Sequence, residues 1–350
     1  MSTGRASLSL VLSLLVQVGH CLCAQAPTHP AVKLLAWPAP PAPPRIKWVA
    51  EYRSALDVGA RKRRPFLEWL AGKTEEVFWL NRPLSVAVDE QGVIFIGDYT
   101  KGIVVMDPVK KAVWEFSSAN GNVLPTPTGL AVDSKLLYAT SANSDQVLIF
   151  DKKGRLLEGL GKTEGINRPV GIAVDESRDL LIVVNSQEHA VRLYSRSLRL
   201  IKTIGERGSG NGQFNMPSYV CIIPNVGFAV SDSGNFRIQI FDFNGQFLLS
   251  FGKAGDGPGE FGRPKGIAAD PDGHLYVVDG VLNSLQVFDL EGQVLLQVGE
   301  SGPEKGQFRI PNGLWIDPKG AIYVADQLNA RIQRFQYLQL EKRERVPNGQ

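Results

Sequence analysis

Residues 263–279 read Arg-Pro-Lys-Gly-Ile-Ala-Ala-Asp-Pro-Asp-Gly-His-Leu-Tyr-Val-Val-Asp. The stretch holds one apolar strand, an Asp-Gly turn and a second apolar strand, which is the pattern of an antiparallel hairpin. The same pattern recurs, with glycine two residues after an initial proline in four copies and aspartate six residues after it in five. The prolines stand 44, 42, 48, 47 and 47 residues apart, at Pro83, Pro127, Pro169, Pro217, Pro264 and Pro311.

Each copy continues through the same elements after this hairpin. A polar loop such as 232–235 leads to an alternating third strand such as 237–241, and a hairpin leads to a fourth strand such as 247–251. Four short strands in roughly 45 residues are typical of a propeller blade, which packs on its neighbours to bury both faces. The sequence therefore predicts an all-β fold, a six-bladed β-propeller of four-stranded antiparallel blades, over residues 80–338.

The two ends of the repeat array predict how the ring closes. The sixth copy ends near Tyr337 after its third strand, while the strand-like segment Ile46–Arg53 lies before the first copy. A ring closed by this N-terminal strand would leave no exposed sheet edge in the last blade. We therefore expect residues 46–53 to supply the outer strand of the sixth blade.

The repeated elements resemble the NHL-repeat family. The resemblance rests on the stretches 263–268, 276–279 and 237–242, and on the Gly-x-Phe connectors 212–214, 259–261 and 306–308. It covers about residues 80–338 and implies a six-bladed ring, here a bacterial exported one. Propellers of this family include lyases, lactonases, RNA binders and protein scaffolds, so the fold does not name the function.

Residues 1–26 predict a signal peptide. Arg5 supplies a positive start, Leu8–Val18 an apolar stretch too short to span a bilayer, and Ala24-Gln25-Ala26 a cleavage site. This indicates a periplasmic or secreted protein. A lipoprotein ending at one of the two cysteines of this segment is the alternative, but neither cysteine follows a small residue. After cleavage only Cys221 remains, so no intramolecular disulfide is expected.

The segments flanking the repeats are basic, and the repeats themselves are not. Residues 27–44 predict a proline-rich linker, residues 45–79 the closing strand and a short helical segment at 64–70, and residues 339–350 a charged tail. Residues 80–338 hold 25 basic and 28 acidic residues, a balance of −3. Because binding to phosphate backbones needs clustered Lys and Arg, nucleic acid is not the expected partner.

Candidate metal ligands are sparse in the repeats. Only His189 and His274 lie there, in loops expected at opposite ends of the ring, so they are not expected to share an ion. The repeated aspartates are predicted to cap turns. A ring of these carboxylates binding Ca²⁺ is the alternative. Cys221 lies where four other copies have alanine and the last has Trp315, which favours a buried small residue over a nucleophile.

Departures from the repeat are the best guide to a site, since a binding site uses different residues in different blades. Tyr219 replaces the repeated glycine and Trp315 a small residue of an innermost strand, and both could instead fill the channel. We expect an aromatic and polar docking surface. It would comprise these two residues and six residues from the loops between second and third strands: Tyr99, Lys101, Gln187, Glu188, His189 and Phe236.

Three functions are compatible with these features. The preferred hypothesis is a non-catalytic exported scaffold that binds a protein or peptide partner in the cell envelope through this loop surface. The alternative is a metal-assisted lyase or lactonase with its site in the central channel. Binding of a small ligand without catalysis is the third.

Overall fold

The computed structural model describes residues 35–60, 78–116, 118–119, 122–123 and 126–338. The predicted signal peptide, the start of the linker, the helical segment at 64–70 and the charged tail lie outside these residues. Within the described residues, no helix is long and apolar enough to cross a lipid bilayer.

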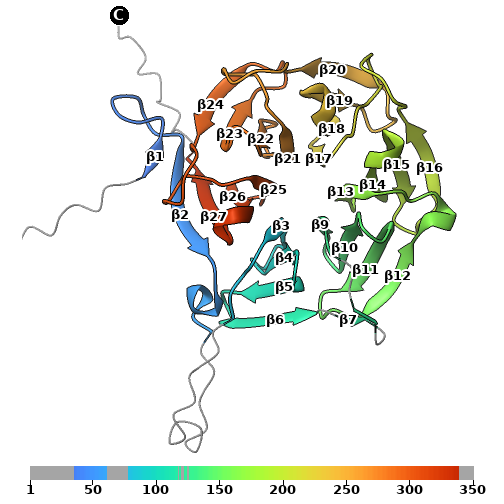
Figure 1. The fold of residues 1–350 in the computed structure, drawn as a ribbon, viewed down its shortest axis with the longest axis horizontal. Coiled ribbons are helices and arrows are strands. Elements are labelled where there is room, and N and C mark those ends of the chain that lie inside the picture. Colours follow the sequence, from blue (N-terminus) through green and yellow to red (C-terminus); the bar gives the residue numbers. More distant parts are fainter. Residues whose placement is uncertain (1–34, 61–77, 117, 120–121, 124–125, 339–350) are drawn as a thin grey trace, which may run out of the picture. The chain divides into compact units, whose positions relative to one another are not determined.

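Six antiparallel sheets stand around a central axis and form a closed ring (Figure 1). This confirms the predicted six-bladed propeller. The first three blades are β3 (Pro83–Val88), β4 (Ile94–Asp98), β5 (Gly102–Asp107) and β6 (Ala112–Phe116); β9 (Gly129–Val132), β10 (Leu136–Ser141), β11 (Gln146–Asp151) and β12 (Leu156–Leu160); and β13 (Pro169–Asp175), β14 (Leu180–Asn185), β15 (Ala190–Ser195) and β16 (Leu200–Ile204).

The other three blades continue the same order from the inner strand outward. They are β17 (Val220–Ile223), β18 (Gly227–Asp232), β19 (Arg237–Phe241) and β20 (Phe247–Phe251); β21 (Pro264–Ala269), β22 (Leu275–Asp279), β23 (Ser284–Phe288) and β24 (Val294–Val298); and β25 (Pro311–Ile316), β26 (Ala321–Asp326), β27 (Arg331–Tyr337) and β2 (Ile46–Tyr52).

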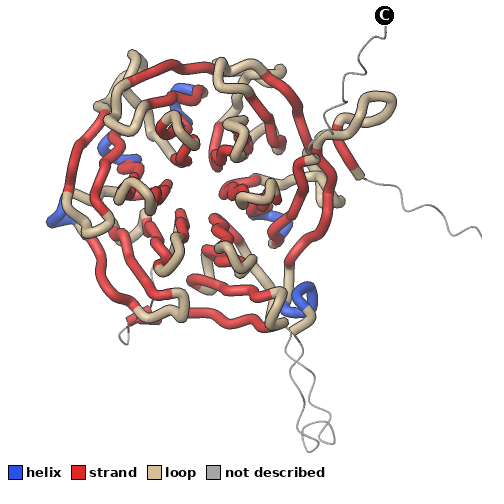
Figure 2. Tube along the Cα trace, turned by 180° about the vertical axis from the view of Figure 1, so that it is seen from behind, coloured by secondary structure: helices blue, strands red, loops and turns tan. Residues whose placement is uncertain are grey.

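The minor elements lie in the connections. A two-stranded hairpin links the first two blades, and short 3-10 helices occupy several loops (Figure 2). These elements are β7 (Ser118–Ala119), β8 (Asn122–Val123), η1 (Ala55–Val58), η2 (Lys162–Glu164), η3 (Ser186–Glu188), η4 (Ser233–Asn235) and η5 (Gln327–Asn329).

Burial along each blade follows from its position in the ring. In the fifth blade every residue of β22 and β23 is buried, because neighbouring blades cover both faces of the middle strands. The outer strand β24 alternates between partly buried and exposed residues, as expected for a strand with one face in water. The apolar core is divided among the six contacts between adjacent blades, including the contact between the sixth and the first.

The repeated glycines allow the inner strands to approach closely around the channel. A Cβ added to Gly171 would lie 2.6 Å from the Cα of Tyr219 in the next blade, and one added to Gly313 would lie 2.6 Å from the Cα of Ser85. A Cβ at Gly266 would meet the backbone of residues 312–314. The repeat therefore keeps glycine where one blade touches the backbone of the next.

The N-terminal strand closes the ring as predicted. β2 pairs antiparallel with β27, in a register that runs from Ile46 opposite Tyr337 to Tyr52 opposite Ile332. Arg331, 1% exposed, joins the two ends of the chain because its guanidinium contacts Glu51 and Asp326, each at 2.7 Å. The last blade thus gains the outer strand that the sixth copy of the repeat lacks.

Part of the segment predicted as a proline-rich linker forms a strand. Ala36–Trp37 form a strand, β1, that pairs with Ile46 and Lys47 of β2. The ring of Trp37 packs edge-on against Phe335, with centroids 5.8 Å apart. An apolar surface left open on the sixth blade thus orders part of a segment that composition alone identifies as a spacer.

Candidate functional site

The two ends of the ring differ in what forms them. One end, here called the loop face, consists of the loops between second and third strands and of the segments that precede the inner strands. The opposite end, the turn face, consists of the turns between first and second and between third and fourth strands. The six loop residues singled out in the sequence all lie at the loop face, in the β4–β5, β14–β15 and β18–β19 connections.

Two of these six side chains are exposed aromatics. Tyr99 is 45% exposed and the guanidinium of Arg82 lies 4.9 Å from its ring centre, while Phe236 is 36% exposed. The ammonium of Lys101 lies 4.4 Å from the ring centre of Phe78. Gln187 is exposed.

The other two side chains are engaged within the protein. Glu188 forms an ion pair of 2.8 Å with Arg192. The Nδ1 atom of His189 accepts a hydrogen bond of 3.1 Å from the backbone N–H of Met216. An imidazole in that role keeps Nδ1 unprotonated, so His189 fixes the segment before the fourth blade.

Aspartates at the start of the loops hold the loop face in shape. Asp279 accepts hydrogen bonds of 2.8–2.9 Å from the backbone N–H groups of residues 262, 263, 281 and 282. In the first blade Asp98 accepts from the backbone N–H groups of residues 81, 82, 100 and 101, at 2.8–3.3 Å. The capping role predicted for these aspartates is confirmed.

The aspartates at the turn face also cap turns. Asp89 accepts from the N–H groups of Gln91 and Val93, and Asp317 from those of Lys319 and Ala321, all at 2.9–3.0 Å. The prediction that the repeated aspartates cap these turns is confirmed. Binding of Ca²⁺ by these carboxylates stays a prediction.

Sequence reasoning missed four exposed apolar side chains on the loop face. The exposed fraction is 54% for Trp79, 59% for Val281, 41% for Ile310 and 51% for Leu328. Val281 and Leu328 each stand two residues after a loop-leading aspartate, and Ile310 directly precedes an inner-strand proline. An apolar residue in an otherwise polar loop was the available signal.

Tyr219 lies inside the ring and not among the exposed loop residues. Its side chain extends from the fourth blade across the channel, and its hydroxyl lies 3.2 Å from the carbonyl oxygens of Leu84 and Thr128 and 3.0 Å from Oδ1 of Asn312. These partners belong to the first, second and sixth blades. Tyr219 therefore crosses the channel near its loop-face end, and burial raises the pKa of its phenol.

The channel beyond Tyr219 is an apolar pocket. It has a volume of about 690 Å³ including space open to solvent, and inner-strand residues such as Val86, Ile172, Ile222 and Trp315 line it. Trp315 also packs against two apolar clusters, one between the sixth and first blades and one between the first and second. The structure therefore places Tyr219 and Trp315 together in the channel, separate from the six loop residues.

The remaining cysteine is a poor nucleophile. Cys221 lines the channel, and burial raises the pKa of its thiol to about 12. Because the thiolate is the reactive form, a thiol with this pKa stays protonated at neutral pH. Cys221 fills a small buried space, as predicted.

We expect Tyr219→Phe to lower the free energy of unfolding by about 1–2 kcal/mol, because the oxygens of Leu84, Thr128 and Asn312 lose the single O–H donor that lies within reach of all three. Urea unfolding followed by circular dichroism measures the change. Tyr99→Phe is the matched control, since Tyr99 is exposed and should be within about 0.5 kcal/mol of the unaltered protein. Equal stability of both variants would show that the hydroxyl does not hold the channel closed.

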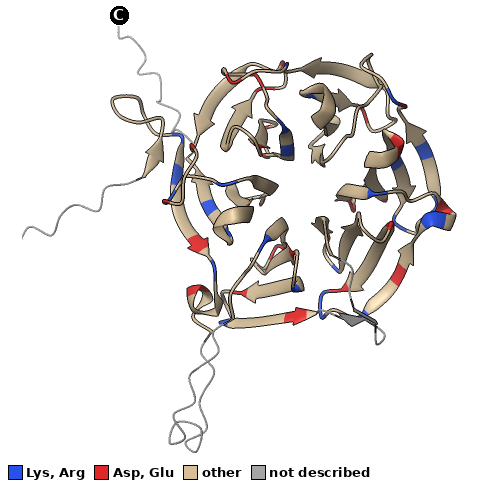
Figure 3. Cartoon of the chain, viewed as in Figure 1, with Lys and Arg blue, Asp and Glu red and all other residues tan. Residues whose placement is uncertain are grey.

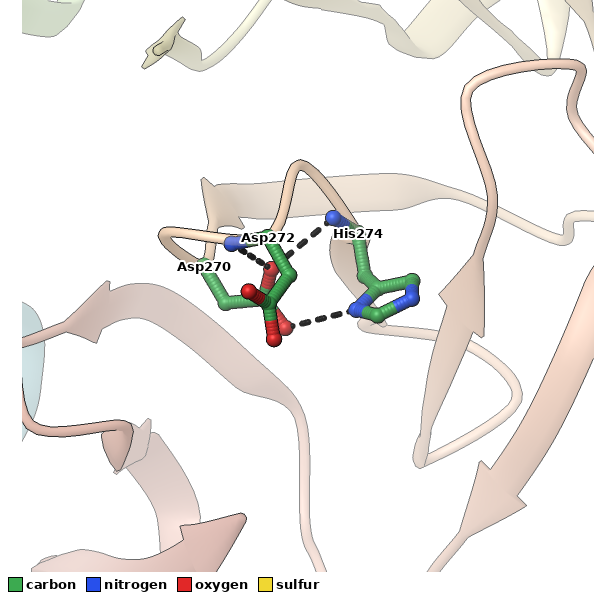
Figure 4. A group of neighbouring side chains, drawn as sticks. All are labelled: Asp270, Asp272 and His274. Carbon is green, nitrogen blue, oxygen red and sulfur yellow. Dashed lines mark hydrogen bonds and ion pairs between the residues drawn. The ribbon is translucent and has the colours of Figure 1, made fainter. Parts of the chain in front are cut away.

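Within the part of the chain that the structure describes, one group of possible metal ligands occurs, at the turn face. Ligand atoms of Asp270, Asp272 and His274 lie within 4.8 Å of one another (Figure 4). Asp270 is already saturated: Oδ1 accepts from the N–H groups of Asp272 and His274, and Oδ2 contacts His274 Nδ1 at 2.8 Å and Tyr276 Oη at 3.1 Å. Four partners use the lone pairs of a carboxylate, so this group fits a turn cap.

A family model also matches part of this chain. The model of the NHL repeat matches residues 261–288, which span the connector into the fifth blade and its first three strands. This chain carries an NHL repeat. No curated protein sequence matches this chain significantly.

Solved structures share its fold. A protein of unknown function from Bacteroides thetaiotaomicron is 17% identical, with a TM-score of 0.61 over 83% of this chain and 75% of that one. A virginiamycin B lyase from Staphylococcus aureus is 14% identical, with a TM-score of 0.55 over 74% of this chain and 96% of that one. At these identities the similarity to the two solved structures shows a shared architecture alone.

Proposed function

We propose that this propeller is a non-catalytic scaffold that binds a protein or peptide partner through its loop face. The supporting observation is the uneven distribution of exposed apolar side chains. Within the described residues, the loops and pre-strand segments of the loop face expose six, whereas the turns of the turn face expose one large apolar residue, Val109. The six are Trp79, Tyr99, Phe236, Val281, Ile310 and Leu328.

The composition of the loop face suits a protein interface. Exposed aromatic and aliphatic side chains close to arginine are the residue types that anchor partners. The loops that carry them are held by buried aspartates on a closed ring, so little ordering is required on binding. Rigid scaffolds with differing loops are a common platform for recognition.

A metal-assisted lyase or lactonase finds less support. His189 and His274 lie in loops at opposite ends of the ring, and each is engaged with a neighbouring residue. Tyr219 crosses the channel at the loop-face end, and apolar residues line the rest. We therefore propose that the repeated carboxylates serve the turns and that no resident cofactor is needed.

The proposed place of action is outside the cytoplasm, in the periplasm or secreted, as the pattern of residues 1–26 indicates. This proposal includes the bacterial origin that the resemblance implies. N-terminal sequencing of the mature protein tests it, with cleavage after Ala26 as the expected result. A mature protein that begins at Met1 would contradict it.

Site-specific photo-crosslinking in the cells that make the protein tests the binding role. A photoreactive residue in place of Phe236 or Leu328 should give crosslinked adducts with a defined partner. The same residue in place of Val109, which is 78% exposed at the turn face, is the matched control and should give none. Equal labelling from both faces, or none from either, would contradict the proposal.

A further inference from the structure

A pocket lies at the turn face where the sixth blade meets the first. Its volume is about 1050 Å³ including space open to solvent. It is lined by Tyr52 of β2, Tyr323 of β26 and Arg334 of β27, and by the turns at 89–92, 108–109 and 317–319. The strand that closes the ring therefore also contributes a side chain to this seam pocket.

The strand register places the three side chains of the sixth blade on one face. Tyr323 pairs with Arg334 across β26 and β27, and Tyr52 pairs with Ile332 across β2 and β27. Residues 332 and 334 point to the same face because side chains alternate along a strand. The centre of the Arg334 guanidinium lies 5.7 Å from the ring centre of Tyr323. Pairing, distance and a shared pocket thus bring the three side chains together.

The polar atoms of these side chains lack partners among the described residues. Tyr52 is 7% exposed and Tyr323 is 4% exposed, yet neither hydroxyl forms a hydrogen bond there. Neither hydroxyl oxygen is fully enclosed, so both reach the wall of the pocket. The Nε atom of Arg334 is enclosed and also has no partner. Because buried polar groups are normally hydrogen-bonded, three such donors in one pocket favour a ligand that accepts hydrogen bonds.

The charge of Arg334 is not used within the described part of the fold. β27 carries two arginines, which are among the basic residues coloured in Figure 3. Arg331 contacts Glu51 and Asp326, each at 2.7 Å. Arg334 forms no ion pair with any described residue. Its guanidinium is therefore available to an anionic group in the pocket.

Acidic residues line the same pocket and make a purely anionic ligand a poor fit. Asp89 is neutralised, because it caps a turn and pairs with Lys152 at 3.1 Å. Asp317 caps the turn of the sixth blade. Glu90 and Lys319 are exposed and form no ion pair within the described residues. The pocket therefore offers an anion as well as a cation, which suits a ligand that carries both charges.

We propose that the seam pocket binds an α-amino acid with an apolar or aromatic side chain. Its carboxylate accepts hydrogen bonds from the Arg334 guanidinium and from the hydroxyls of Tyr52 and Tyr323, since guanidinium and carboxylate groups form short charge-assisted hydrogen bonds. Its ammonium group contacts Glu90. Its side chain lies against Val109, which is 78% exposed. This site is separate from the loop face and adds a small ligand to the proposed binding of a protein.

Isothermal titration calorimetry with L-phenylalanine tests the pocket. Two matched compounds each lack one charge: 3-phenylpropionate has no ammonium group, and 2-phenylethylamine has no carboxylate. We expect the full propeller to bind L-phenylalanine about 10-fold or more tightly than either compound, because each lost charge removes a charge-assisted hydrogen bond. Equal affinity for 3-phenylpropionate would overturn the proposal, as would absence of L-phenylalanine binding.

Two variants assign the charges of the ligand to the two sides of the pocket. Arg334→Met should weaken binding of L-phenylalanine about 10-fold or more and leave 2-phenylethylamine unchanged. Glu90→Gln should weaken L-phenylalanine about 3-fold and leave 3-phenylpropionate unchanged, since Glu90 is exposed and its ion pair is screened. Arg155→Met is the matched control, because Arg155 lies at the turn face of the second blade with its side chain 76% exposed. It should bind as the unaltered protein does.

A third variant keeps the test decisive if Arg334→Met does not fold. Tyr323→Phe retains the buried ring and removes one hydroxyl, so it should weaken L-phenylalanine about 3-fold or more. Unchanged affinity in Tyr323→Phe and Glu90→Gln would overturn the pocket. The photo-crosslinking test of the loop face is independent of these results. Adducts from position 236 without binding of L-phenylalanine would reject the seam pocket alone, and the reverse pattern would reject the protein-binding role alone.

Discussion

A chain that lacks residues 46–52 is expected to lose about 5 kcal/mol or more of its free energy of unfolding and to melt without a single cooperative transition. The strand buries Ile46 and Tyr52, which are 1% and 7% exposed, against the sixth blade and its neighbours. Losing large buried side chains costs about 2–5 kcal/mol each when the site cannot collapse. The backbone hydrogen bonds to β27 are lost as well.

The deletion also removes polar contacts that span the two ends of the chain. Trp48 Nε1 donates to Gln333 Oε1 at 3.1 Å, and Arg331 loses the carboxylate of Glu51. The third strand of the sixth blade then becomes an open sheet edge, which favours aggregation. Stability of this ring should therefore depend on a segment outside the repeats.

Thermal unfolding by circular dichroism and limited proteolysis measure this effect. Val49→Ser is the matched control within the same strand, because Val49 lies at a bulge in the pairing with β27 and is 38% exposed. Its change should stay within about 0.5 kcal/mol. A deletion variant that melts like the unaltered protein would show that the ring closes by other contacts.

The blades and their closure could be predicted because local chemistry specifies them. Alternating apolar residues, Asp-Gly turns and the aspartates that cap them act over a few residues. Each copy of the repeat therefore contains the residues that specify one blade. The closing strand could be predicted by counting, because the sixth copy lacks an outer strand and 46–53 had no other partner. The fold of this chain can therefore be predicted largely from its repeated sequence.

The site could be predicted only in outline, because its decisive contacts join distant parts of the chain. The sequence marks Tyr219 as a departure, but the partners of its hydroxyl are 91–135 residues away and decide that it crosses the channel. Composition alone assigns Trp37 to the linker, because its partner, Phe335, lies at the other end of the chain.

Gly266→Ala is expected to lower the free energy of unfolding by about 3 kcal/mol. The added Cβ would meet the carbonyl oxygen of Asn312 and lie 2.7 Å from the backbone nitrogen of Leu314, both on the inner strand of the next blade. Backbone atoms of a paired strand cannot move aside as a side chain does, so the blades must separate or shift. Overpacking of this kind costs about 1–3 kcal/mol and more where the structure cannot relax.

Gly161→Ala is the matched control, and urea unfolding of both variants gives the comparison. Gly161 has an extended backbone, and its added Cβ would lie 3.6 Å from Oε2 of Glu164, an ordinary contact. The substitution also reduces the freedom of the unfolded chain, so its effect should stay within about 0.5 kcal/mol of zero. Both variants carry the same chemical change, and only one places it between two blades. If Gly266→Ala had the same free energy of unfolding as the control, the inner strands could accommodate a Cβ atom. The recurring glycine would then need an explanation other than close contact around the channel.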